Sequence, residues 1–175
     1  MVYFLVNVFL AILPPTRCFL IKRIFLRLAG VKLGARTKVC GRVKFYGGGQ
    51  VSIGSDCWIG IGASFFTAVG ANIFIGDRCD IAPEVSFICG SHEIGDRSRR
   101  AGPGLSRDIV IGNGAWLGTR SIMLGGLKLG DSSVVGAATL LLDKEYPPDF
   151  VIVGVPGRLL RPIHNDEDRK SDDLV

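Results

Sequence analysis

A six-residue repeat runs through most of the chain and constrains the fold more than any other feature. Each unit begins with a large apolar residue, and its fifth position holds a small one. The repeat is clearest over residues 107–140, where Ala115 follows Ile111 and Ser121 follows Leu117 at this spacing. A period of six fits neither an α-helix nor a simple strand. It is typical of a β-solenoid, in which short strands alternate with turns around a prism.

The same register extends backwards and predicts five coils of three units each. All fifteen unit heads are apolar: Leu33, Val39, Phe45, Ile53, Ile59, Phe65, Ile75, Ile81, Phe87, Ile111, Leu117, Met123, Leu129, Val135 and Leu141. We expect these heads to stack inside as apolar columns, with small residues such as Thr37 and Ala63 beside them. Glycine or alanine follows most first and second heads, where we expect a positive φ or too little room for a side chain. Bulkier residues follow the third heads, so the third corner should accept insertions.

The five cysteines are an odd number, which argues against a disulfide framework and favours a reducing compartment. Cys57 and Cys79 occupy inward small positions, where a thiol acts as a compact apolar group.

This pattern resembles the hexapeptide-repeat acyltransferases, whose fold is a left-handed parallel β-helix, an exception to the right-handed crossover preference. The stretch from Tyr146 to Arg161 resembles the motif with which that family leaves the last coil and begins a short helix. The resemblance covers residues 30–161 and is closest to sugar O-acetyltransferases of the galactoside, maltose and exopolysaccharide group. It implies an all-β chain with a helical segment over 1–30, the β-helix over 31–145 and a C-terminal extension with a polar tail over 146–175.

The first 29 residues differ in kind from the repeat. Residues 1–13 are almost wholly apolar, Pro14-Pro15 interrupts them, and residues 16–29 form a basic segment with apolar residues at helical spacing. The apolar run is too short to span a bilayer, and no basic residue precedes it as in a signal peptide. Two roles stay open, and both can hold together. The segment can cap the open end of the solenoid, or it can lie in an anionic membrane interface.

The formal net charge of +5 is concentrated in two regions, residues 17–38 and residues 97–107. No nucleic-acid recognition motif accompanies these charges, so nucleic acid is not an expected partner. Anionic lipid, nucleotide or pyrophosphate groups suit the pattern better. The expected location is the cytoplasm, at the inner face of the cell membrane if the first segment contacts lipid.

Between Phe87 and Ile111 the repeat is interrupted by eighteen more residues than one unit requires. A long insertion in an economical repeat is a functional candidate, and we expect residues 88–108 to protrude. The insertion contains His92, one of two histidines in the chain.

Transfer of an acetyl group from a thioester to a hydroxyl needs a base, and imidazole, with an unperturbed pKa near 6.5, suits that task. In the resembling family a histidine in this loop is the catalytic base, and Gly90-Ser91-His92 matches its placement. Glu93 and Glu84 are candidates to orient the imidazole.

The resemblance also implies where acetyl-CoA binds as the acyl donor. A tryptophan at the position of Trp116 lies beside the active site in the family. The backbone N–H of Thr119 would face the thioester oxygen, and Ala137 would leave room for the pantetheine arm. Basic residues near the end of the solenoid would meet the phosphates; the matching positions are Lys144, Arg158 and Arg161.

The acceptor is less constrained than the donor. An Asn and an Asp contact the acceptor in galactoside acetyltransferases, but the matching positions here are Ser64 and either Val69 or Gly70. A galactoside acceptor is therefore not implied.

Together these features favour an acetyl-CoA-dependent O-acetyltransferase of surface polysaccharide or lipopolysaccharide biosynthesis. The acceptor would be a small-molecule or lipid-linked sugar, and the expected assembly is a homotrimer with active sites shared between neighbours. The chemistry requires no metal. An N-acetyltransferase acting on an amino sugar or nucleotide-linked amino sugar is an alternative, as is a non-catalytic scaffold. A γ-class carbonic anhydrase shares the fold, but its zinc site needs three histidines and the chain has only His92 and His164.

Overall fold

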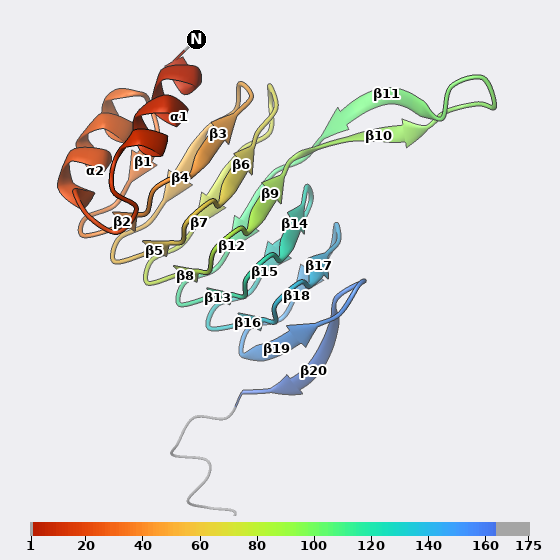
Figure 1. Ribbon diagram of the computed structural model, residues 1–175. Helices are drawn as coiled ribbons and strands as arrows, with labels where there is room; N and C mark the ends of the chain where they lie inside the picture. Colours follow the sequence, from red (N-terminus) through yellow and green to blue (C-terminus); the bar gives the residue numbers. More distant parts are fainter. Residues whose placement is uncertain (1, 164–175) are drawn as a thin grey trace, which may run out of the picture.

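A computed structural model describes residues 2–163, which form a prism of stacked coils with two helices at one end (Figure 1). Each coil contributes one short strand to each of three parallel sheets, which are the faces of the prism. The first face contains β1(Lys32–Leu33), β4(Val51–Ile53), β7(Ile73–Ile75), β12(Ile109–Ile111), β15(Lys128–Leu129) and β18(Glu145–Tyr146). The second contains β2(Lys38–Val39), β5(Trp58–Ile59), β8(Asp80–Ile81), β13(Trp116–Leu117), β16(Val134–Val135), β19(Phe150–Val153) and β20(Arg158–Pro162). The third contains β3(Lys44–Tyr46), β6(Ser64–Phe66), β9(Ser86–Ile88), β14(Ile122–Leu124) and β17(Leu140–Leu141).

The interior of the prism confirms the repeat register. All fifteen predicted heads are buried, and the small fifth-position residues, including Thr37, Cys57 and Cys79, are buried beside them. The rings of Phe45, Phe65 and Phe87 stack with centroids 5.0 and 4.9 Å apart. Two further strands, β18 and β19, pair with β15 and β16 and add part of a sixth coil to the five predicted.

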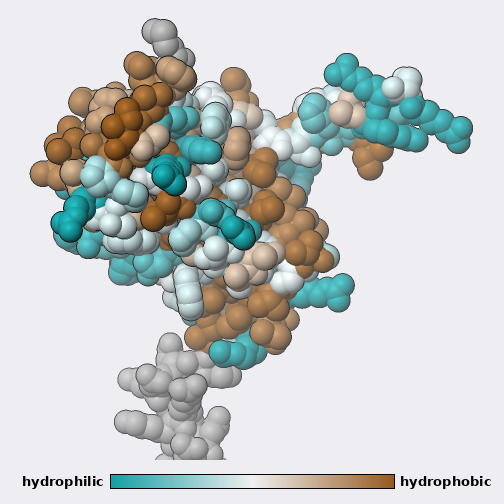
Figure 2. Space-filling view, in the orientation of Figure 1, coloured by the Kyte–Doolittle hydropathy of each residue, from teal (hydrophilic) through white to brown (hydrophobic). Residues whose placement is uncertain are grey.

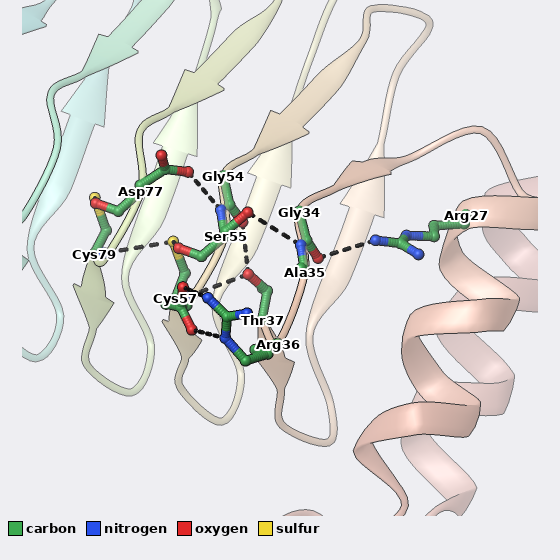
Figure 3. Close-up of polar contacts among 11 residues, drawn as sticks. Arg27, Gly34, Ala35, Arg36, Thr37, Gly54, Ser55, Cys57, Asp77 and Cys79 are labelled. Carbon is green, nitrogen blue, oxygen red and sulfur yellow. Dashed lines mark hydrogen bonds and ion pairs between the residues drawn. The ribbon is translucent and has the colours of Figure 1, made fainter.

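Side chains at the first corner, between the first and second faces, tie each coil to the next (Figure 3). The N–H of Ala35 donates to the Oγ of Ser55 at 3.1 Å, and the N–H of Ser55 donates to the Oδ1 of Asp77 at 2.6 Å. The same step recurs from Asp77 to Asn113 at 2.9 Å and from Asn113 to Asp131 at 2.7 Å. A ladder of backbone donors and side-chain oxygens therefore runs along this corner from the first coil to the fifth.

The glycines that directly follow the heads at this corner are required by close approach and not by a positive φ. A Cβ at Gly76 would lie 2.7 Å from the Oδ1 of Asn113, the side chain that continues the ladder. The positive φ falls two residues later, at non-glycine positions such as Arg36 (56°) and Arg78 (54°). Of the two reasons expected for these glycines, lack of room for a side chain is therefore the one that holds at this corner.

The helices α1(Val2–Ile12) and α2(Phe19–Leu28) cover the open end of the first coil. The N–H of Phe45 donates to the Oδ1 of Asn7 at 2.9 Å, and the Nδ2 of Asn7 donates back to the Phe45 carbonyl at 3.1 Å. The carbonyls of Leu10 and Pro15 accept the N–H groups of Arg42 and Gly41. These bonds replace those that a preceding coil would make, so the capping role is confirmed. Within residues 2–163, no helix has both the length and the apolar character needed to cross a bilayer.

The end of the prism departs from expectation. The short helix predicted from the closing motif is wrong for residues 146–163, which form strands β18, β19 and β20. The chain turns back after Val153, and β20 pairs antiparallel with β19, with Arg158 opposite Val153 and Arg161 opposite Val151. This returning strand covers the outer edge of the second face. The β-branched residues Val151, Ile152 and Val153 favour extended backbone over a helix. The polar tail, including His164, lies outside the described residues.

The stacked phenylalanine column generates a test of the core. We expect Phe65→Ala to lower the free energy of unfolding by about 3–5 kcal/mol, because it removes a ring packed on both sides inside the prism. Phe66 is the matched control, since its ring stacks on Tyr46 but is 38% exposed. Phe66→Ala should cost about 1 kcal/mol in the same urea titration. Equal losses in the two variants would contradict the assignment of the inward columns.

Candidate active site

The predicted insertion protrudes from the third corner, between the third and first faces, as a β-hairpin (Figure 1). Its strands are β10(Gly90–Ile94) and β11(Ala101–Ser106). The chain leaves and rejoins the corner at one point, because the N–H of Arg107 donates to the Cys89 carbonyl at 3.1 Å. The N–H of Asn72 then donates to the Oδ1 of Asp108 at 2.7 Å, which returns the chain to the coil register. The prism therefore holds the base of the hairpin firmly.

His92 lies on β10, exposed, opposite Gly104. Its Nδ1 lies 2.9 Å from the carbonyl oxygen of Gly102. A carbonyl only accepts, so the proton of the neutral ring must sit on Nδ1 for this bond to form. The lone pair is then on Nε2, which leaves that nitrogen free to take a proton from a substrate.

The two carboxylates predicted to orient His92 do not contact it in this chain. The Oε2 of Glu84 accepts from the Nε of Arg120 at 2.5 Å, and this bond raises the pKa of the Arg120 guanidinium. Glu93 is exposed next to His92 on the strand, and neighbouring strand residues project to opposite sides. Among residues 2–163, the group that holds the imidazole is the Gly102 carbonyl, which carries no side-chain signal in the sequence.

The second corner, between the second and third faces, presents free backbone donors at Thr119 and Ala137. These residues occupy the same turn position in consecutive coils, and the Thr119 carbonyl accepts from the N–H of Ala138 at 2.8 Å. Within the described part of the chain, the N–H groups of Thr119 and Ala137 make no hydrogen bond. The equivalent position in the preceding coil is Pro83, which has no N–H. The row of adjacent donors therefore begins at Thr119, and an extended ligand with amide oxygens could bond along it.

The second face carries Trp116, which is 56% exposed on β13. Trp116 pairs in register with Val134, Val134 with Val151, and Val151 with Arg161. These outward side chains therefore form one row from the indole ring of Trp116 to the guanidinium of Arg161 at the end of the prism. Arg158 lies on the same returning strand and is exposed.

Lys144 lies elsewhere, at the third corner below the hairpin, with its Nζ 4.6 Å from the centroid of the Tyr146 ring. A cleft of about 440 Å³ opens at the root of the hairpin, lined by residues that include Ser91, Leu105 and Leu124. Arg107 and Asp143 form an ion pair on its wall. Sequence reasoning missed this pair, because the two residues are 36 positions apart and meet only through the stacking of the coils.

The structure thus divides the predicted site into two parts. His92 lies on the hairpin, in a hollow of about 610 Å³ lined only by hairpin residues such as Asp96 and Arg99. Thr119 and Ala137 lie at the second corner, and Trp116 and Arg161 on the second face. The hairpin extends away from the prism (Figure 1), so one chain does not bring His92 to the free donors.

Comparison with known proteins identifies the family. No protein-family model matches the chain. The galactoside O-acetyltransferase of Escherichia coli K12 is 36% identical over 124 residues, which are 67% of this chain and 59% of that protein. The putative colanic acid biosynthesis acetyltransferase WcaF of Escherichia coli K12 is 30% identical over 137 residues, 78% of this chain and 71% of WcaF.

A solved structure of galactoside acetyltransferase in complex with coenzyme A superposes with a TM-score of 0.69 at 25% identity, covering 94% of this chain and 80% of that one. The chain spans about three fifths of the length of the galactoside O-acetyltransferases that it matches. The likeness confirms the left-handed parallel β-helix. The chain belongs to the hexapeptide-repeat acyltransferase family.

Proposed function

We propose that the chain is an acetyl-CoA-dependent O-acetyltransferase that acts on a sugar hydroxyl, with His92 as its general base. The observation that carries the proposal is the bond between the Nδ1 of His92 and the Gly102 carbonyl, because in the neutral ring it places the proton on Nδ1 and leaves Nε2 as the acceptor. The names of the relatives support the reaction class, since they are a galactoside and a putative colanic acid acetyltransferase.

The chemical step needs one proton shuttle. Nε2 of His92 takes the proton of the acceptor hydroxyl while its oxygen attacks the carbonyl carbon of the thioester. The carbonyl oxygen gains negative charge, which the free N–H of Thr119 can stabilise by about 3–4 kcal/mol. The C–S bond then breaks, and the imidazolium returns the proton to the thiolate. The products are an O-acetyl sugar and the free thiol of coenzyme A.

The donor site proposed for acetyl-CoA follows the second corner. The N–H of Ala137 would bond the pantetheine arm one coil below Thr119, and Trp116 would flank the thioester. Arg161 and Arg158, both exposed on β20, would meet the phosphates at the end of the prism. Lys144 lies at the third corner, so it could meet the same donor only from a neighbouring chain.

The division of the site supports a homotrimer. We propose that the hairpin of one chain carries His92 to the second corner of the next, so that three equal sites form around a three-fold axis. Closed cyclic symmetry satisfies such a head-to-tail contact with one repeated interface.

The acceptor proposed here is a sugar of surface polysaccharide or lipopolysaccharide biosynthesis, small or lipid-linked, modified in the cytoplasm at the inner face of the membrane. A galactoside fits poorly at the positions matching the family's acceptor contacts. The Oγ of Ser64 donates to the Gly62 carbonyl at 3.3 Å, and Val69 is an exposed apolar residue.

An amino-sugar acceptor is the alternative. Mild alkali distinguishes the two products, because it cleaves an ester and leaves an amide intact.

We expect His92→Ala to lower the rate of acetyl transfer at least about 100-fold with little change in melting temperature. The hairpin contributes to the chemistry and little to the core. Ile94→Ala, another exposed residue of β10, is the control and should keep nearly full turnover. Retention of more than a tenth of the wild-type turnover in His92→Ala would contradict the assignment of the base.

The backbone N–H of Thr119 can be removed by substituting proline. We expect Thr119→Pro to lower kcat about 100-fold, because proline lacks the N–H and the same turn position already accepts Pro83 one coil earlier. Ile61→Pro is the matched control, since it occupies this turn position in the second coil, away from the proposed donor site. Equal kinetics for Thr119→Pro and the wild type would remove this N–H from the mechanism.

A further inference from the structure

The outward side of the helical cap is apolar and uncovered. Helix α1 has no charged residue, and its side away from the prism exposes Phe4, Leu5, Val8 and Ile12. Figure 2 shows apolar side chains gathered over the two helices at this end of the molecule. A helix that is apolar all round is normally buried on every side, so this exposed side requires a cover.

Helix α2 adds a second apolar stripe with a basic edge. Leu20, Ile21, Ile24 and Leu28 are exposed and fall within an arc of about 100° on the helix. Arg23 and Arg27 lie along one edge of this arc. Such a division of one helix into an apolar stripe and a basic edge is typical of helices that lie in the plane of a lipid interface.

The two stripes belong to one surface. A shallow groove between the helices is lined only by apolar residues, among them Leu5 of α1 and Leu28 of α2. The rings of Phe9 and Phe25 pack across the contact with centroids 4.0 Å apart. We call the exposed apolar residues of both helices the cap face.

The charged residues in the sequence that forms the cap and the first coil have one sign. Residues 1–55 contain nine of the 21 lysines and arginines and none of the 16 aspartates and glutamates. Three of the nine are engaged within the chain: buried Lys22 donates to the Pro14 and Pro15 carbonyls, Arg27 donates to the Leu33 and Gly34 carbonyls, and Arg36 pairs with Asp56. Arg17, Lys32 and Lys44 are among those that remain exposed. This complements an anionic surface and would repel a second cap of the same charge.

A cleft beside α2 offers a place for a phosphate. Its volume is about 550 Å³, and its lining includes Leu20 of the cap face together with Arg23, Lys38 and Trp58. Two carboxylates also line it, Asp56, which is paired with Arg36, and Asp80, so the cations Arg23 and Lys38 are the groups that could meet a phosphate. Phe19 and Trp58 form one wall, with ring centroids 5.6 Å apart. The Nε of Arg23 is buried and has no hydrogen-bond partner within residues 2–163. A phosphate oxygen that entered the cleft would satisfy this donor with a charge-assisted bond.

We propose that the cap face docks onto an anionic lipid bilayer, with the cleft at Arg23 and Lys38 taking a lipid phosphate. Helix α1 has eleven residues, so it would lie in the interface and not across the membrane. Exposed apolar side chains supply the insertion, and the surrounding cations supply the preference for anionic lipid. This contact does not depend on the acetyl-transfer chemistry.

Co-sedimentation of the full chain with vesicles tests the proposal. We expect binding to vesicles of phosphatidylcholine with phosphatidylglycerol, weakening as the salt concentration rises, and little binding to phosphatidylcholine alone. Ile12 and Leu28 are 77% and 82% exposed, so Ile12→Ser/Leu28→Ser should reduce binding at least about tenfold with an unchanged melting temperature. The matched control is Val69→Ser/Ile94→Ser, at sites 87% and 90% exposed away from the cap, which should bind like the wild type.

Three results would overturn the proposal. The first is no vesicle binding by the wild type, or equal binding by the two double variants. The second is a wild type that does not bind vesicles and a double variant, Ile12→Ser/Leu28→Ser, whose assembly mass is smaller than that of the wild type. This result would assign the cap face to a contact with a second copy of the chain. The third concerns Arg23→Gln, which should weaken binding to anionic vesicles. If instead inorganic phosphate stabilises the wild type but not Arg23→Gln, and vesicle binding is the same in both, the cleft is a site for free anions.

Discussion

Every part of this molecule depends on how closely one coil lies on the next. At the first corner the N–H of Ser55 reaches the Oδ1 of Asp77 at 2.6 Å, and the same step links the later coils. The approach leaves no room for a Cβ at positions such as Gly54, which would meet the backbone carbon of Gly76 at 2.6 Å. The first and second corners are therefore short and regular. The third corner, where bulkier residues follow the heads, carries the only insertion among residues 2–163 that leaves the prism.

This constraint separates the two parts of the proposed site. The prism fixes the N–H groups of Thr119 and Ala137 at one corner, in consecutive coils about 4.8 Å apart. The proposed base, His92, sits on a hairpin that is inserted at the third corner. Such preorganised donors and a separately positioned imidazole suit acyl transfer, in which charge develops on one oxygen and a proton moves once in each direction. The same close stacking leaves strand edges at both ends, which α1, α2 and β20 cover.

The sequence predicts the prism well because its pattern is local and repeated. Heads such as Phe45 and Phe65 are separated by a fixed number of residues, so their inward columns follow directly from the period. The place of His92 follows from the break in that period. The predicted C-terminal helix rests on a motif resemblance, whereas Phe150–Val153 is a run of aromatic and β-branched residues that favours a strand and pairs with β16. The partner of Glu84 could not be predicted, since Arg120 meets it only through coil stacking across 36 positions. The row of free N–H groups at Thr119 and Ala137 can be predicted from the repeat. Pro83 aligns with Thr119, and proline at that turn position indicates that an N–H there makes no bond within the prism.

Complementation between two inactive variants tests the central claim that each site joins His92 of one chain to the Thr119 corner of its neighbour. His92→Ala and Thr119→Pro would be unfolded together, refolded as a mixture and assayed for acetyl transfer. In a randomly mixed trimer about one quarter of the sites combine an intact His92 with an intact Thr119, so the account predicts about one quarter of the wild-type activity. Activity no higher than that of either variant alone, in a mixture shown to contain hybrid assemblies, would contradict it.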